Sequence, residues 1–91
     1  MGFPKRVDCN QPSIVQALRM AGVVITDTHE IGHGYPDISA TYRNNVYLLE
    51  VKLPKCGLTP AERTWHERNQ AANIGIVHSA EEALRFCGAI E

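Results

Sequence analysis

The chain has 91 residues, with nine Lys and Arg against ten Asp and Glu and a formal net charge of −1. A chain of this length holds one hydrophobic core, and an apolar share of 44% is ordinary for a globular protein. No apolar run approaches the ~20 residues of a membrane span, and the first residues lack the pattern of a signal peptide. The composition predicts one small domain at residues 10–91, preceded by an irregular lead-in at residues 1–9, with no membrane partner.

The cysteines Cys9, Cys56 and Cys87 are odd in number and lack the spacing of a zinc finger. Disulfides are rare in the cytosol, where thiols stay reduced. The cysteines therefore indicate a cytoplasmic protein without a thiolate zinc site.

Residues 10–21 have the pattern of an amphipathic helix. Asn10 is suited to the N-cap, Pro12 to the first turn and Gly22 to a left-handed C-cap. An apolar stripe spaced for one helix face is formed by Ile14, Ala17, Leu18 and Ala21.

A β-branched run at residues 23–28 predicts the first strand. The following segment, Thr28 to Tyr35, contains His29, Glu30 and His33 without a paired ligand spacing. Glycine-rich polar loops often carry contacts, so a substrate-facing loop is favoured over a second metal site.

Two strand-like runs between Gly34 and Lys52 flank Asn44-Asn45, which predicts a β-hairpin with a two-residue turn. That turn would place Ala40 opposite Leu49 and Asp37 opposite Lys52. Alternation then divides the hairpin into two faces. The polar face holds Asp37, Ser39, Glu50 and Lys52, and the apolar face holds Ile38, Ala40, Tyr42, Tyr47, Leu49 and Val51.

In this register Asp37 and Glu50 are diagonal neighbours, about 7–8 Å apart at Cα. Two carboxylates on a rigid hairpin can share a hard cation such as Mg²⁺, and Lys52 offsets part of their repulsion. The alternative is a surface ion pair between Asp37 and Lys52 on a solvated face, which contributes little.

After a loop at residues 53–58, a helix is predicted at residues 59–72. Thr59 and Glu62 form a capping box, and Trp65 is expected to pack against the sheet. Residues 74–78 are predicted to form a fourth strand in a central position. Ser79 and Glu82 cap a last helix with a stripe of Ala83, Leu84 and Cys87.

Pro36-Asp37 followed by Glu50-Val51-Lys52 resembles the PD-(D/E)XK nuclease signature. The likeness continues into Leu58-Thr59-Pro60-Ala61-Glu62, which opens a helix. Over roughly residues 10–88 the chain is similar to a stand-alone VRR-NUC domain, a branch related to archaeal Holliday-junction resolvases.

The resemblance implies an α/β fold: a restriction-endonuclease-like α-β-β-β-α-β-α core with a central mixed sheet flanked by helices. It assigns catalysis to Asp37, Glu50 and Lys52. It assigns metal binding, with Mg²⁺ or Mn²⁺ and no organic cofactor, to Asp37, Glu50 and the backbone carbonyl of Val51.

Substrate contacts are expected from a second group of residues: Gln11, His33, Ser39, Lys55 and Glu62. Relatives often carry a glutamate near the start of the first helix; here Gln11 is the nearest isostere and lacks the charge. The alternative is that Asn10 caps the helix and Gln11 is solvated. Glu62 stands where relatives more often have a site-facing glutamine, and it could instead simply close its cap.

These residues predict a divalent-metal-dependent endonuclease that cuts DNA phosphodiesters. By analogy with the family, the substrate is branched DNA such as a four-way junction, cut by a homodimer. The small basic surface of a chain with net charge −1 also favours a dimer. The alternatives are a non-catalytic DNA-binding or accessory module with the same fold, and an adaptor that binds protein.

Overall fold

The computed structural model describes residues 9–91, so the predicted lead-in lies outside the described residues except for Cys9. Over residues 9–91 the chain forms a mixed α/β structure with three α-helices, a short 3₁₀ helix and one four-stranded sheet. The elements in chain order are α1 (Gln11–Met20), β1 (Val24–Asp27), η1 (His29–Ile31), β2 (Ile38–Tyr42), β3 (Asn45–Val51), α2 (Pro60–Arg68), β4 (Ile74–Val77) and α3 (Ala80–Phe86). The α/β class and the succession of three helices and four strands agree with the sequence prediction.

The strands lie in the order β1-β2-β3-β4. The first three are antiparallel, and β4 runs parallel to β3. The prediction of a central position for the fourth strand is wrong, because β4 forms an edge. Ile76 is consequently 43% exposed, although its strand is apolar in sequence.

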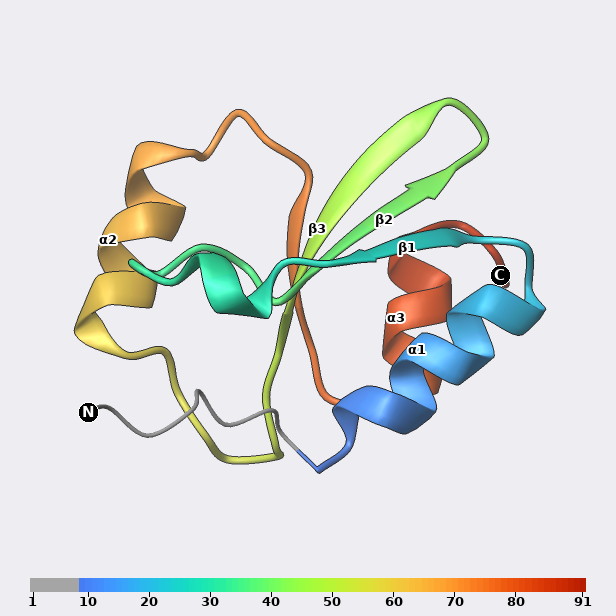
Figure 1. Cartoon of the computed structure of the whole chain (residues 1–91), viewed down its shortest axis with the longest axis horizontal. Helices are drawn as coiled ribbons and strands as arrows, with labels where there is room; N and C mark the ends of the chain where they lie inside the picture. Colours follow the sequence, from blue (N-terminus) through green and yellow to red (C-terminus); the bar gives the residue numbers. More distant parts are fainter. Residues whose placement is uncertain (1–8) are drawn as a thin grey trace.

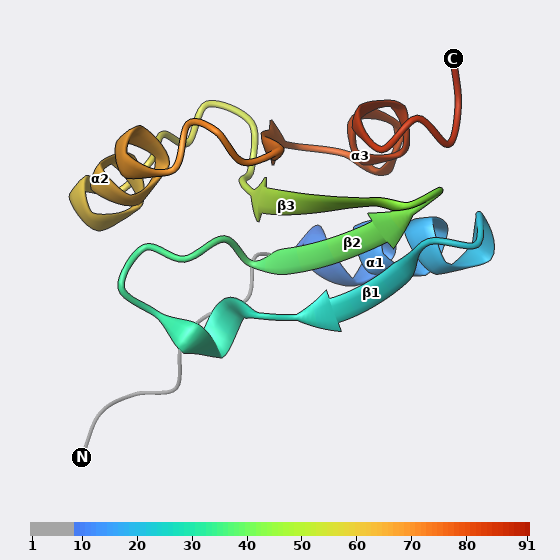
Figure 2. The ribbon, with the colours of Figure 1, turned by 90° about the horizontal axis from the view of Figure 1, so that it is seen from above.

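The hydrophobic core lies between one face of the sheet and the two helices α1 and α3. Figures 1 and 2 show these helices together at one end of the molecule, with α2 at the other. The core consists of Ile14, Leu18, Val23, Ile38, Ala40, Leu49, Val51, Val77, Ala83 and Cys87. The residues from β2 and β3 come from alternate positions, as the predicted apolar face of the hairpin requires.

Helix α1 ends as predicted, because Gly22 adopts φ +89° and its amide donates to the carbonyl of Arg19. Its start differs from the prediction. Asn10 occupies the N-cap position, but within the described residues its side chain makes no capping hydrogen bond. Asn10 instead donates to the carbonyls of Lys52 and His78, which ties the helix start to the ends of β3 and β4.

The hairpin turn lies one residue earlier than predicted, and this shifts the register by two residues. Arg43 and Asn44 both have positive φ, and Asn45 is the first residue of β3. Ala40 therefore pairs with Tyr47. A shift of two residues leaves every side chain on its predicted face. Beyond the last pair, Ile38 with Leu49, Glu50 comes close to the position opposite Asp37 rather than diagonal to it.

Helix α2 is shorter than predicted and packs against a loop. None of its residues is buried. The ring of Trp65 lies edge-on to Tyr35 of the β1–β2 loop, with ring centroids 5.0 Å apart. This contact holds α2 beside the loop, beyond the end of the sheet (Figure 1).

Candidate functional site

The site is built around Glu50, the only acid in β3. Its neighbours Leu49 and Val51 point into the core, so alternation directs Glu50 to the opposite face. There it is 1% exposed, and its Oε2 is buried without a hydrogen-bond partner among the described residues. The predicted polar face therefore exists, but at Glu50 it is not solvated.

Asp37 is held beside Glu50 by backbone contacts at the entrance to β2. Its Oδ2 accepts a hydrogen bond of 2.8 Å from the amide of Val51. Its own amide donates to the carbonyl of Leu49, and its carbonyl accepts from the amide of Thr28. These contacts leave the Asp37 side chain little freedom, so its position relative to Glu50 is preorganised.

The two acids interact strongly. Burial is the main reason that the pKa of the Glu50 carboxyl is raised to about 10. The neighbouring carboxyl of Asp37 also favours the protonated form of Glu50, and so does charge repulsion from Asp37 and Glu62. The ammonium of Lys52 acts in the opposite direction. At neutral pH and without a cation, Glu50 is therefore protonated.

Helix α2 supplies a third carboxyl group to the site through Glu62. Its Oε1 lies 2.7 Å from Nζ of Lys52 and also accepts a hydrogen bond of 2.8 Å from the amide of Thr59. Burial acts to raise the pKa of Glu62, but the Lys52 ammonium and the Thr59 amide lower it by more. Both alternatives for Glu62 therefore hold, because it closes the capping box of α2 and also faces the site.

His66 belongs to the site and was missed from the sequence. Its Nε2 lies 3.4 Å from Oε1 of Glu50. Burial lowers the pKa of His66, so this contact joins two neutral groups and is a hydrogen bond rather than an ion pair. The available signal was the spacing, since His66 follows Glu62 by four residues and lies on the same face of α2.

A pocket of about 320 Å³ opens beside these carboxylates, between the β1–β2 loop and the start of α2. It is lined by His29, His33, Gly34, Tyr35, Asp37, Thr59, Ala61 and Glu62. His33, expected to contact substrate, is exposed at this pocket. The predicted substrate-facing loop thus forms one wall of a cavity that reaches Asp37.

The other residues expected to contact substrate belong to different elements and differ in exposure. Ser39 is half-buried on the same face of the sheet as Glu50, opposite Leu48. Lys55 is exposed in the loop after β3. Gln11 is 3% exposed with Oε1 unpartnered among the described residues, so the alternative of a solvated Gln11 is wrong.

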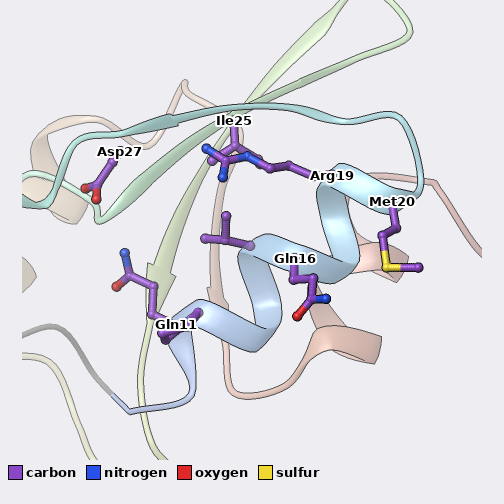
Figure 3. Close-up of a pocket in the computed structure, with 8 residues that line it drawn as sticks. Gln11, Gln16, Arg19, Met20, Ile25 and Asp27 are labelled. Carbon is purple, nitrogen blue, oxygen red and sulfur yellow. The ribbon is translucent and has the colours of Figure 1, made fainter.

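A larger groove of about 580 Å³ lies between α1 and β1 (Figure 3). Gln11 and Asp27 lie at one end and Met20 at the other. Oδ1 of Asp27 contacts Nδ1 of His29 at 2.7 Å, which, together with a hydrogen bond from the His29 amide, lowers the pKa of Asp27. The groove is mainly apolar and carries no pair of carboxylates, so the smaller pocket is the better candidate for chemistry.

The donor set fits a hard divalent cation. A buried carboxyl with an unpartnered oxygen gains most from a cation that neutralises it, and Asp37 offers a second carboxylate beside it. Within residues 9–91 there is no cluster of three or more His, Cys, Asp or Glu side chains that could hold a metal ion. A cation held by Asp37 and Glu50 would rest on two carboxylates, backbone oxygen and water, a set that Mg²⁺ accepts.

Comparison of the chain with family models, with curated proteins and with solved structures gave no match. Within residues 9–91, no helix has the length and apolar character that a membrane crossing requires.

Proposed function

We propose that the protein is a Mg²⁺- or Mn²⁺-dependent endonuclease that hydrolyses DNA phosphodiester bonds. The observation that carries the proposal is the buried Glu50 carboxyl beside Asp37, with one oxygen that has no partner among the described residues. Two acids held together in this way destabilise the folded chain unless a cation joins them. An acid with so strongly perturbed a pKa, on a rigid hairpin end beside another acid, supports a catalytic role.

Asp37, Glu50 and the backbone carbonyl of Val51 are the residues that would hold the cation. A bound Mg²⁺ or Mn²⁺ supplies Lewis acidity and a hydroxide-like nucleophile at neutral pH. The chain itself contributes a fixed geometry, because the Val51 amide holds one oxygen of Asp37.

Lys52 is the proposed charge-stabilising residue. It follows Glu50 by two positions, so it projects from the same face of the strand. Its ammonium is held 2.7 Å from Glu62, which orients it without removing it from the site. From there it would orient the nucleophile or stabilise the charge that develops on the scissile phosphate.

The substrate and the assembly are part of the proposal. The resemblance to a VRR-NUC domain favours branched DNA such as a four-way junction, and the two-fold symmetry of a junction matches a homodimer with two sites. A net charge of −1 also favours a dimer, because the electrostatic part of DNA binding grows with the number of phosphates contacted.

The test is cleavage of labelled four-way junction, flap and linear duplex DNA, with Mn²⁺ and with EDTA. Asp37→Asn and Glu50→Gln should each lower the rate by about 10²-fold or more, since each removes a ligand charge at nearly constant shape. Lys52→Ala should also slow cleavage strongly but leave Mn²⁺ affinity unchanged. Glu67→Gln, an exposed position on α2, is the matched control and should cleave normally.

A non-catalytic DNA-binding module is the second candidate. It is favoured by Gln11, a neutral amide where relatives often carry an acid. Binding of junction DNA without cleavage in any divalent cation would establish this alternative. Wild-type cleavage rates in the variants of Asp37, Glu50 and Lys52 would contradict the nuclease proposal.

A further inference from the structure

The pocket between the β1–β2 loop and α2 has walls that hold their shape. Gly34 has φ +84°, and a Cβ there would overlap the backbone of Ala61. The loop and the helix therefore meet in direct backbone contact. Such close approach, together with left-handed backbone at His33 and Gly34, is typical of segments that clamp a ligand.

The pocket lining includes Tyr35, from the β1–β2 loop. Trp65 packs edge-on against the ring of Tyr35, with ring centroids 5.0 Å apart. Because Trp65 supports the ring from α2, Tyr35 can offer a fixed flat surface. Fixed aromatic rings of this kind stack on unpaired nucleobases.

The charges in the pocket decide which part of a nucleotide it suits. Asp37 and Glu62 both line it, and carboxylates repel a free phosphate. Carboxylates and imidazoles do accept or donate hydrogen bonds at the edges of bases, and His29 and His33 also line the pocket. Lys52 pairs with Glu62 at 2.7 Å and so offsets part of the repulsion that this carboxylate exerts on a neighbouring phosphate.

The volume sets the size of the ligand. A cavity of about 320 Å³ is at the lower end of the range of small-ligand pockets, roughly 300–1,000 Å³. A cavity of this size suits a ligand as small as one nucleoside.

From these observations we propose that the pocket binds the nucleoside part of one unpaired nucleotide, stacked on Tyr35, next to the phosphodiester that is cut. The placement of the nucleoside next to the cleaved phosphodiester rests on the proposed function. The inference also implies a preference for DNA with an unpaired nucleotide at that position. Base stacking in the pocket would supply affinity that the weakly charged surface lacks.

The experiment measures binding and not cleavage. Trp65 is the only tryptophan of the chain and touches Tyr35, so its emission reports on the pocket. A short oligothymidylate, titrated in Ca²⁺ and again in EDTA, should change this emission in a saturable way. The blunt duplex made from the same strand and its complement should compete poorly.

The variants separate stacking from folding. Tyr35→Leu should weaken binding by about 5- to 150-fold, the range that the loss of one stacked base corresponds to, whereas Tyr35→Phe should bind as the wild type does. Ala61→Leu adds bulk at another residue that lines the pocket and should weaken binding similarly. Ala71→Leu, also exposed but outside the pocket, is its control.

Ala61→Leu decides the question if Tyr35→Leu does not fold. Wild-type affinity for oligothymidylate in a folded pocket variant, or equal competition by the blunt duplex, would overturn the proposal. Its failure is distinguishable from failure of the nuclease proposal. Normal cleavage with wild-type binding in Ala61→Leu would reject the pocket alone, and pocket-dependent binding without any cleavage would reject catalysis alone.

Discussion

At its C-terminal end, strand β3 is buried on both faces, but the chemistry of the two faces is opposite. Leu49 and Val51 are fully buried against α1 and α3, and the residue between them, Glu50, is 1% exposed on the other face. On the first face apolar contacts stabilise the fold. On the second face a carboxyl is removed from water beside another acid. Similar burial therefore has opposite energetic consequences, and the unfavourable case is Glu50, the acid to which we assign cation binding.

The largest effect is expected on the apolar face. Leu49→Ala should lower the free energy of unfolding by about 2–5 kcal/mol, because it leaves a cavity in the core. Urea denaturation followed by circular dichroism measures the change. Val46→Ala, on the same strand but 53% exposed, is the control and should stay within about 0.5 kcal/mol. Equal losses in both variants would show that the face is not a packed core.

The second effect has the opposite sign. In EDTA, Glu50→Gln should stabilise the protein at pH 7.5 by on the order of 2–4 kcal/mol. The folded pKa of Glu50, about 10, lies above the ordinary value of 4.5. Below pH 4.5 the carboxyl is protonated in both the folded and the unfolded chain, so it does not lower the stability. As the pH rises from 4.5 toward 10, the unfolded chain releases this proton and the folded chain keeps it, so the free energy of unfolding falls.

Thermal unfolding at several pH values tests this slope. The stability that Glu50→Gln gains over the wild type should shrink as the pH falls toward 4.5. With Mn²⁺ present the wild type should become the more stable of the two, because the variant binds Mn²⁺ less well. Glu67→Gln, exposed on α2, should show neither trend. A Glu50→Gln variant that is less stable than the wild type in EDTA at pH 7.5 would contradict the assignment of Glu50 as a strained acid.

The smallest effect concerns the contact that closes the site. Gly34→Ala should cost about 1–3 kcal/mol, because the residue has a left-handed φ and its Cβ would meet the backbone of Ala61. Gly22→Ala is the matched control, since Gly22 has a similar φ of +89° but nothing within 4 Å of the added carbon. Urea denaturation of both variants should therefore show a greater loss for Gly34→Ala. An equal loss in the two variants would mean that the left-handed backbone alone explains the effect of Gly34→Ala. It would also mean that the β1–β2 loop and α2 are not tightly joined.

Much of the fold followed from local patterns in the sequence. The succession of elements agreed with the prediction, as did the left-handed Gly22 and the capping box of Thr59 and Glu62. The division of the hairpin into an apolar and a polar face also agreed. Periodicity and capping are properties of neighbouring residues, so a sequence alone can indicate them.

The sequence also determined which acids share a face, but only the tertiary structure decided their separation. A register shift of two residues keeps Asp37 and Glu50 on one face, so the alternating pattern cannot distinguish the two registers. The edge position of β4, the burial of Gln11 and the placement of His66 beside Glu50 depend on contacts between residues distant in the chain. Such contacts leave no local period in the sequence, which is why the polar face was predictable and its burial was not.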